Sequence, residues 1–447
     1  MRNLAQTINH KDDIRHVMQD VLTKAKAKGA TDAAVSVSCD EGYHVDVRMG
    51  EIETVAFSED RGVSVVIYLD KQKGSATSSD TSPKALEDMI NHAYDIAKVS
   101  AKDPCFGLPD KDLVQMAYPE LDLSHAWDMT PEHAAELAIT CEDKARSKDN
   151  RIKNADGTSV SSYAFTRGYA NTHGFSGEVQ STRHSISCAL MGEHKGDMQR
   201  DYAYTTARQH DNLMSIDEVA NLAAERTVSR LNPTKLKTQK CPVIFSSRVS
   251  SSLLGSFIQA ISGASVYQKN TFLLDSIGKH VFPSNISVYE VPHELGALGS
   301  SPFDSEGIVT RNNVLVDGGI LQQYVLGSYS ARRLGLATTA NAGGVHNLTI
   351  KPTMGELSDI IKTMGTGLLV TELMGQGVNG ITGDYSRGAS GFWVEQGEIQ
   401  YPVDGLTIAG NLKDMYLQIL GVGSDINPSI STRCGSILIE EMTIAGV

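Results

Sequence analysis

The chain has 447 residues, of which 40% are apolar and 21% charged, an ordinary composition for a globular protein of two or three domains. Its net charge of −13 at pH 7 argues against a nucleic-acid-binding surface, which needs clustered Lys and Arg. No apolar run approaches the roughly 20 residues that cross a bilayer, and residues 1–16 lack the apolar core of a signal peptide, so we expect a cytoplasmic protein without membrane contact.

The first 231 residues combine helical and strand patterns. The predicted helices cover 12–28, the segments that begin after Ser82 and after Thr130, and 217–231. Alternating apolar and polar residues predict strands, and Gly50 and Gly62 separate the early ones. The predicted strands cover 33–38, 44–48, 53–57, 63–69, 161–170, 177–191 and 197–206. This pattern indicates an antiparallel meander with helices packed on it.

Residues 232–242 are polar and have prolines near both ends, which predicts a linker between a domain of residues 1–231 and a domain of residues 243–447. The second domain is expected to be rich in strands. It begins with a predicted strand at 243–245 and a helix at 249–261 that Gly263 ends, and further helices are expected near 354–364 and 412–420. We therefore predict an α+β protein, with N-terminal helices packed on an antiparallel sheet and a strand-rich, glycine-rich C-terminal domain.

Residues 365–410 contain eleven glycines between short apolar runs. Glycine in a strand costs conformational entropy, so its frequent use indicates tight turns or close approach of one backbone to another. We interpret the segment as short strands joined by glycine turns, a surface suited to an extended peptide or a partner chain.

Three short motifs match catalytic patterns without their structural context. Residues 375–380 match GxGxxG but do not lead into a helix, which a dinucleotide site requires. Residues 276–279 match SxxK, but no KTG or SDN element accompanies them. Residues 388–392 resemble a nucleophile elbow, yet Phe392 stands where the motif needs Gly.

The histidines and cysteines do not form a metal-binding pattern. No His has another His four or five residues away, and His293-Glu294 begins an HExxH motif that Ala297 breaks. His184 and Cys188 lie about 13 Å apart if they share a strand, too far for one ion. The six cysteines are at least 36 residues apart, which fits a reducing cytoplasm better than a disulfide framework or a zinc ribbon.

Two acidic segments leave alternatives open. Asp304 and Glu306 are either a carboxylate pair or parts of a capped turn. Asp384 and Arg387 either bind a peptide terminus or form a local turn. We favour the turn in both cases, because Asp side chains commonly hydrogen-bond backbone N–H groups in turns.

Nine segments spread over almost the whole chain carry a resemblance to a known family. They are TDAAVSVS (31–38), KGSATSSDTSP (73–83), STRHSISC (181–188), GDMQRDYAYT (196–205), VYQKNTFLLDS (266–276), SPFDSEG (301–307), GSYSARRLGL (327–336), TELMGQGVNGITGDYSRGASGFWVEQGEIQYPV (371–403) and LTIAGNLKDM (406–415). With these segments the chain resembles the PmbA (TldE) branch of the TldD/PmbA metallopeptidase family. Together they are far more specific than the short motifs above.

The resemblance implies a partner and a metal. In this family the TldD subunit carries a zinc-binding HExxxH helix and a later Cys ligand, and it pairs with a PmbA-type subunit of the same fold that lacks those ligands. The resemblance further implies a hollow heterodimeric peptidase that admits unstructured peptides. Its implied roles are maturation of the peptide antibiotic microcin B17 and turnover of an unstable antitoxin.

The family's metal-binding helix corresponds here to residues 243–263. The alignment places Gly255 and Ala260 at the positions of the two His, and Ser256 at that of the catalytic Glu. Gly and Ala side chains offer no ligand, and Ser is a poor base near neutral pH. Cys434 lies downstream of the family's Cys position, which falls near 420–425. We therefore expect no catalytic residue and no metal in this chain, and zinc in the partner subunit.

Our leading hypothesis is the PmbA/TldE-type subunit of a cytoplasmic zinc-dependent peptidase. It would join a TldD-type catalytic subunit in a heterodimer or higher assembly, or form a homodimer when alone, and would help to hold unstructured peptides. Asp384, Arg387, Gly388 and Ser390 are the candidates for substrate or partner contact. The alternatives are a metallopeptidase active on its own with unusual ligands, and a non-enzymatic regulator that binds gyrase or another protein.

Overall fold

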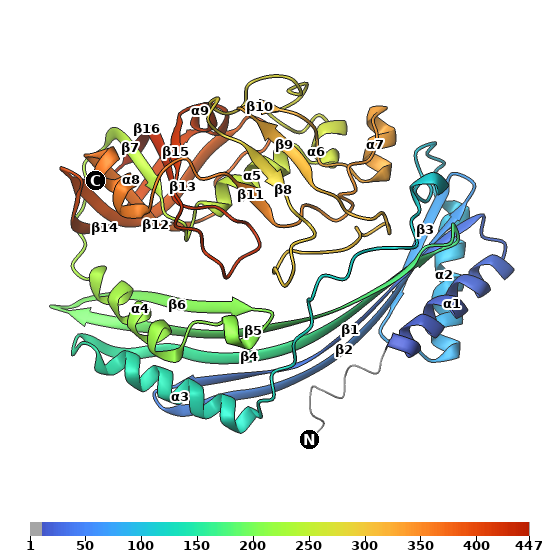
Figure 1. Ribbon diagram of the computed structural model, residues 1–447, viewed down its shortest axis with the longest axis horizontal. Coiled ribbons are helices and arrows are strands. Elements are labelled where there is room, and N and C mark those ends of the chain that lie inside the picture. The colour runs from blue at the N-terminus through green and yellow to red at the C-terminus, as the bar shows by residue number, and fades with distance from the viewer. Residues whose placement is uncertain (1–10, 447) are drawn as a thin grey trace.

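The structure is a computed structural model that describes residues 11–446, and it confirms the predicted α+β class. The N-terminal half (residues 11–231) is a long curved sheet with helices on its outer face (Figure 1). The C-terminal half (residues 232–446) is a strand-rich body on the inner, concave side of that sheet (Figure 1). No helix between residues 11 and 446 combines the length and the apolar character that crossing a membrane requires.

The N-terminal sheet has the strand order β3-β2-β1-β4-β5-β6, and all neighbouring strands are antiparallel. Its strands are β1 (Asp32–Arg48), β2 (Glu51–Leu69), β3 (Gln72–Ser78), β4 (Ile152–Asn171), β5 (Ser176–His194) and β6 (Asp197–Ala207). The prediction of four short strands before residue 70 was wrong, because there are two long ones. Gly62 does not separate strands; it lies within β2 opposite Ser38. Since β2 and β4 both hydrogen-bond to β1, the polar middle of β1 continues as strand.

The two faces of this sheet differ in chemistry. Odd-numbered residues of β1 other than Glu41 are buried against helices, whereas even-numbered residues such as Ser36 and Ser38 face the concave side. The helices α1 (Lys11–Ala27) and α2 (Pro83–Val99) cover one end of the outer face, and α3 (Pro131–Ser147) and α4 (Ile216–Ser229) cover the other end (Figure 1).

The helices of this half begin where the sequence predicts them. The side-chain oxygen of Ser82 accepts a hydrogen bond from the N–H of Ala85 at the start of α2, and Thr130 caps α3 in the same way. Ser215 and Glu218 form a reciprocal capping box at the start of α4. Each cap satisfies backbone N–H groups that have no partner within the helix.

The C-terminal half contains a closed ring of strands. Its larger sheet has the order β14-β13-β12-β7-β16-β15, and β14 also pairs with β16, so β7, β12, β13, β14 and β16 form a ring. A smaller sheet has the order β10-β9-β8-β11. The strands are β7 (Gln239–Phe245), β8 (Val288–Glu290), β9 (Asn313–Asp317), β10 (Ile320–Leu321), β11 (Leu348–Ile350), β12 (Gly367–Met374), β13 (Asp384–Glu395), β14 (Glu398–Asn411), β15 (Ile419–Val422) and β16 (Ile437–Ala445).

Five short helices connect these strands: α5 (Ser251–Ala260), α6 (Gly263–Tyr267), α7 (Ser328–Leu334), α8 (Leu357–Met364) and α9 (Leu412–Leu417). The sequence predicted α5, α8 and α9 but missed α6 and α7. Gly263 does not end a helix as predicted; it begins α6, because the Ser262 side chain accepts a hydrogen bond from the Ser265 N–H and caps a new helix.

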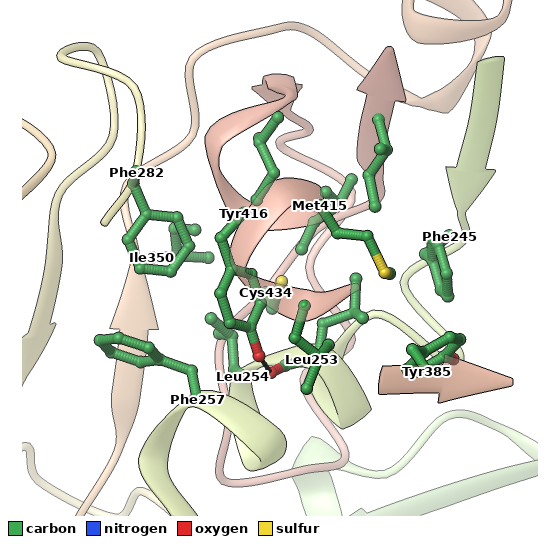
Figure 2. Packing of buried hydrophobic residues seen from close by; sticks show 14 of the residues in the cluster. Phe245, Leu253, Leu254, Phe257, Phe282, Ile350, Tyr385, Met415, Tyr416 and Cys434 are labelled. Atoms are coloured by element: carbon green, nitrogen blue, oxygen red, sulfur yellow. Dashed lines mark hydrogen bonds between the residues drawn. The ribbon is translucent and has the colours of Figure 1, made fainter. Parts of the chain in front are cut away.

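One large apolar core fills the C-terminal half, and α5 lies in it (Figure 2). Phe257 of α5 packs edge-on against Phe282, with ring centroids 5.0 Å apart, and also contacts Tyr416 of α9. The Tyr416 hydroxyl donates a hydrogen bond of 2.8 Å to the Leu253 carbonyl oxygen (Figure 2). The core therefore fixes the position of α5.

The predicted linker is packed rather than free. β7 begins at Gln239, inside the segment 232–242, and Leu236 is buried in the core of the C-terminal half. The halves also touch elsewhere, since the Thr206 N–H donates to Ser429 Oγ and Arg332 donates to the Leu108 carbonyl. The division into domains at 1–231 and 243–447 stays a prediction.

Candidate functional site

Helix α5 carries the three positions that the family resemblance relates to a metal motif. Gly255 is exposed, and a Cβ atom there would meet nothing within 4 Å. Ser256 is half-buried and donates its hydroxyl to the Ser252 carbonyl oxygen at 3.1 Å. Ala260 is buried in the core. None of the three supplies a metal ligand or a strong base.

The geometry of the helix agrees with this conclusion. Ala260 lies five positions after Gly255, which corresponds to a rotation of about 140° around an α-helix. The first position therefore faces open space and the second faces the core. The residues present do not fit a zinc site.

Cys434 behaves as a core residue. Its thiol donates to the Gly435 carbonyl oxygen at 3.2 Å and lies among apolar side chains close to α9 (Figure 2). Burial raises the pKa of Cys434 to about 12, so the thiol stays protonated near neutral pH. A metal ligand must be a thiolate, and this environment opposes its formation.

The remaining histidines and cysteines do not converge either. Across the part of the chain that the structure describes, no group of three or more His, Cys, Asp or Glu side chains is arranged to hold a metal ion. His184 is fully buried, with Nδ1 at 2.9 Å from Ser162 Oγ and Nε2 at 2.8 Å from the His125 carbonyl. Burial lowers the pKa of His184, so the ring is a neutral core group.

The SxxK match does not assemble a nucleophile and a base. Ser276 is buried and donates its hydroxyl to the Leu274 carbonyl oxygen, whereas Lys279 is exposed. The Ser276 N–H donates to the Tyr324 hydroxyl. Ser276 therefore closes a turn in the core of the C-terminal half.

Several glycines of residues 365–410 allow close backbone approach, as the sequence predicts. A Cβ atom on Gly377 would lie 1.7 Å from the Ser386 carbonyl oxygen, and one on Gly391 would lie 1.9 Å from the Leu369 carbonyl oxygen. The strands are longer than predicted, and β13 is paired with β12 on one side and β14 on the other. β13 thus has no free edge for a peptide strand, and the exposed parts of this region include the β12–β13 loop and the β13–β14 turn.

The four contact candidates lie on β13 but do not form one surface. Asp384 accepts hydrogen bonds from Thr382 Oγ1 (2.7 Å) and Asn411 Nδ2 (3.2 Å), contacts that lower its pKa. Ser390 is buried and donates to Asp404 Oδ1 at 2.6 Å. Gly388 pairs with β12 and β14.

Arg387 is at an odd-numbered position of β13, whereas the other three candidates are at even-numbered positions. It lies between the core residues Tyr385 and Ala389 along the strand. Its Nε atom is buried without a hydrogen-bond partner among the described residues. Asp384 forms a local turn, as the simpler interpretation predicts, and the contact role of all four residues stays a prediction.

A cleft of about 600 Å³ lies between the two halves. Its floor is the concave face of the N-terminal sheet, and its opposite wall consists of two loops of the C-terminal half, residues 300–305 and 342–346. Most of the exposed lining is apolar, and nine small hydroxyl side chains interrupt it: Ser36, Ser38, Ser64, Thr77, Ser78, Ser181, Ser300, Ser301 and Ser305. Sequence analysis missed this site, although the serines at alternate positions of TDAAVSVS were a usable signal.

The charged groups of the cleft are occupied by the fold itself. Arg208 donates to the carbonyl oxygens of Thr182, Ala297 and Leu298, and burial lowers its pKa to about 10. The Asp304 carboxylate accepts hydrogen bonds from three backbone N–H groups, those of Glu306, Ile308 and Ala342. Asp304 is thus a turn residue, as favoured above, and burial raises its pKa to about 6.

The cleft therefore offers apolar surface and scattered hydroxyl groups more than free charge. Hydroxyls both donate and accept hydrogen bonds, so they can satisfy the N–H and C=O groups of an extended peptide without selecting side chains.

Comparison with known proteins identifies the family. Models of the PmbA/TldA metallopeptidase family match as domain 1 over residues 33–97, as central domain over 124–231 and as C-terminal domain over 238–446. The chain is 47% identical over 435 residues to the metalloprotease PmbA of Escherichia coli O157:H7, with 97% of each chain covered. It is 45% identical to a PmbA homologue of Haemophilus influenzae, over 97% of this chain and 96% of that one. The chain belongs to the PmbA/TldD metallopeptidase family, in its PmbA branch.

Solved structures share the fold. A Bacteroides thetaiotaomicron protein with a suggested role as a modulator of DNA gyrase is 26% identical, with a TM-score of 0.92 over 98% of this chain and all of that one. TldE from Thermococcus kodakarensis, 22% identical, has a TM-score of 0.85 over 96% of this chain and all of that one. The latter likeness concerns the fold alone.

Proposed function

We propose that this chain is the PmbA/TldE-type, non-catalytic subunit of a cytoplasmic zinc-dependent peptidase. A TldD-type partner would supply the zinc, which activates a water molecule for peptide hydrolysis. The observation that carries the proposal is the chemistry of α5, where the positions that the family resemblance relates to the metal motif hold Gly255, Ser256 and Ala260, and the last of them faces the core. Unstructured peptides are the proposed substrates, including a microcin precursor and an antitoxin.

In this proposal the chain's own residues bind and enclose the peptide. The hydroxyl-lined cleft holds an extended segment by backbone hydrogen bonds, which gives affinity with little sequence preference. The curved N-terminal sheet forms one wall and excludes folded proteins by size. Asp304 and Arg208 keep the opposite loops in place through their backbone hydrogen bonds.

The test is a zinc count by mass spectrometry, with cleavage of an unstructured peptide, on this chain alone, on the TldD-type chain of the same genome and on their mixture. We expect this chain alone to show neither zinc nor cleavage, and the mixture to show both. One zinc per chain with cleavage by this chain alone would overturn the proposal and favour the self-sufficient peptidase. Lack of pairing, together with retention on gyrase, would favour the regulator.

The β12–β13 loop is a candidate substrate element within this proposal. Deletion of residues 376–390 is a poor test, because it removes the first half of β13 from the ring. Ile381→Asp is sharper, since Ile381 lies in the loop and is 57% exposed. Its matched control is Ile399→Asp on β14, where Ile399 is 49% exposed. We expect the first variant alone to slow cleavage by the pair, with zinc content unchanged; equal cleavage by both variants would rule the loop out.

A further inference from the structure

One edge of the N-terminal sheet is long and unpaired. β2 extends from Glu51 to Leu69, but β3 pairs only with its last part, from Val63 to Leu69. Within residues 11–446, no strand pairs with the outer side of residues 51–61, here called the β2 edge. Eleven residues of strand correspond to about 37 Å of open backbone hydrogen-bonding groups. Proteins usually cover or shorten such an edge.

Apolar side chains that continue the core of the sheet extend to the β2 edge, where they are exposed to solvent. Three register pairs connect β1 to β2: Tyr43 with Phe57, Val45 with Val55, and Val47 with Ile52. The β1 members are 3%, 0% and 0% exposed, whereas the β2 members are 64%, 45% and 53% exposed. The apolar layer beneath α3 thus continues onto β2 and ends in solvent. A single peptide strand would pair with the backbone but leave these side chains exposed.

The charge of the β2 edge indicates what it would accept. It carries four carboxylates, on Glu51, Glu53, Glu59 and Asp60, against one guanidinium, on Arg61. Arg61 lies 3.0 Å from Glu59 and Arg48 lies 3.8 Å from Glu53, but these pairs are solvent-exposed and weak. A second copy would bring another excess of three negative charges to the same ribbon, which disfavours self-pairing.

We infer that the β2 edge is the surface on which the proposed TldD-type subunit docks, through an edge strand that alternates apolar side chains with Lys or Arg. The added strand continues the sheet, and the partner's own apolar layer covers Ile52, Val55 and Phe57. The carboxylates select a basic strand and reject a second copy of this chain. This inference rests on the proposed function, because it places the partner that the function requires.

The test measures the dissociation constant between this chain and the TldD-type chain of the same genome by isothermal titration calorimetry. Phe57→Asp is expected to weaken binding by about 30-fold or more, the effect of a hot-spot side chain. The matched control is Met198→Asp, because Met198 is also 64% exposed and lies on β6, the opposite edge strand of the same sheet. This control should bind as the unchanged chain does. Circular dichroism and thermal unfolding establish that both variants are folded.

Hydrogen exchange provides a readout specific for strand pairing. Amides within residues 51–61 should gain protection in the complex, together with one partner strand that carries Lys or Arg. A partner strand without basic residues would overturn the charge assignment.

Equal binding by Phe57→Asp would overturn the inference and leave the proposed function standing, whereas no binding by the unchanged chain would overturn both. A dimer of this chain alone that Phe57→Asp dissociates would identify a second copy as the occupant, against the inference.

Discussion

The two halves of the molecule bury their strands in different ways. The N-terminal sheet has helices on one face, leaves the other face to the cleft and ends in the unpaired β2 edge. In the C-terminal half, β14 pairs with β16 and the strands close into a ring around one core. An open sheet leaves backbone and side chains available for ligands and partners, whereas a closed ring offers mainly its loops. The open N-terminal half is therefore suited to binding ligands and partners, and the closed C-terminal half is suited to holding α5 and the cleft loops in fixed positions.

The largest expected effect comes from emptying the core of the ring. Phe257 is fully buried on α5 and contacts both Phe282 and Tyr416. Phe257→Ala should lower the free energy of unfolding by about 3–5 kcal/mol, the usual cost of such a cavity. Urea denaturation measures it, with Phe57→Ala as the exposed control, for which we expect a change within about 0.5 kcal/mol. A loss below about 1 kcal/mol at Phe257 would contradict rigid positioning of α5.

The second prediction concerns an ion pair that joins the two halves. Arg248, just before α5, lies 2.5 Å from Asp201 of β6, whose side chain is 2% exposed. Burial alone would raise the pKa of Asp201, but the hydrogen bond and charge of Arg248 outweigh it and the pKa is lowered. Arg248→Met should cost about 3 kcal/mol, because it leaves the buried carboxylate of Asp201 with the more distant Arg230, at 3.5 Å, as its ion-pair partner within residues 11–446.

A double-mutant cycle with Asp201→Asn checks this origin. If the ion pair carries the effect, the double variant should lose clearly less stability than the sum of the two single variants. Additive losses would mean that each side chain acts through its own packing instead.

The third prediction rests on two buried aspartates whose pKa values are shifted in opposite directions. Burial raises the pKa of Asp304 to about 6, above the ordinary value of about 3.9. The folded state therefore binds the proton more tightly, and this stabilisation is fully present below about pH 4 and lost as pH rises to about 6. Asp201, with its lowered pKa, contributes stability that is lost only as pH falls below the ordinary value.

Asp304→Asn should remove the first dependence, which amounts to about 1–3 kcal/mol between pH 4 and pH 7. Urea denaturation at pH 4, 5, 6 and 7 measures the difference between the variant and the unchanged chain. A constant difference across these pH values would show that Asp304 does not titrate in this range.

Much of the N-terminal half follows from local sequence, and much of the C-terminal half does not. Ser82 and Thr130 predict the starts of α2 and α3, because a capping hydrogen bond involves only residues that are close in the sequence. The ring depends on the pairing of β14 with β16, which are separated in the sequence by α9 and β15. No local sequence pattern predicts this pairing. The cleft likewise joins Ser36 to loops near residue 304, and its serines look like surface residues in the sequence. The family resemblance supplied the relation of α5 to a metal motif, but only the fold shows that Ala260 faces the core.

The smallest expected effect compares one substitution at equivalent positions in the two halves. Ser215 and Ser250 are the N-cap residues of α4 and α5, but only Ser215 makes a side-chain capping bond. Ser215→Ala should cost about 1 kcal/mol, because it removes the hydroxyl that accepts from the Glu218 N–H. Ser250→Ala should change stability by no more than about 0.5 kcal/mol, because α5 is held by its core contacts rather than by a cap. Urea denaturation of both variants tests the distinction, and equal losses would show that local capping matters as much in the ring as in the open sheet.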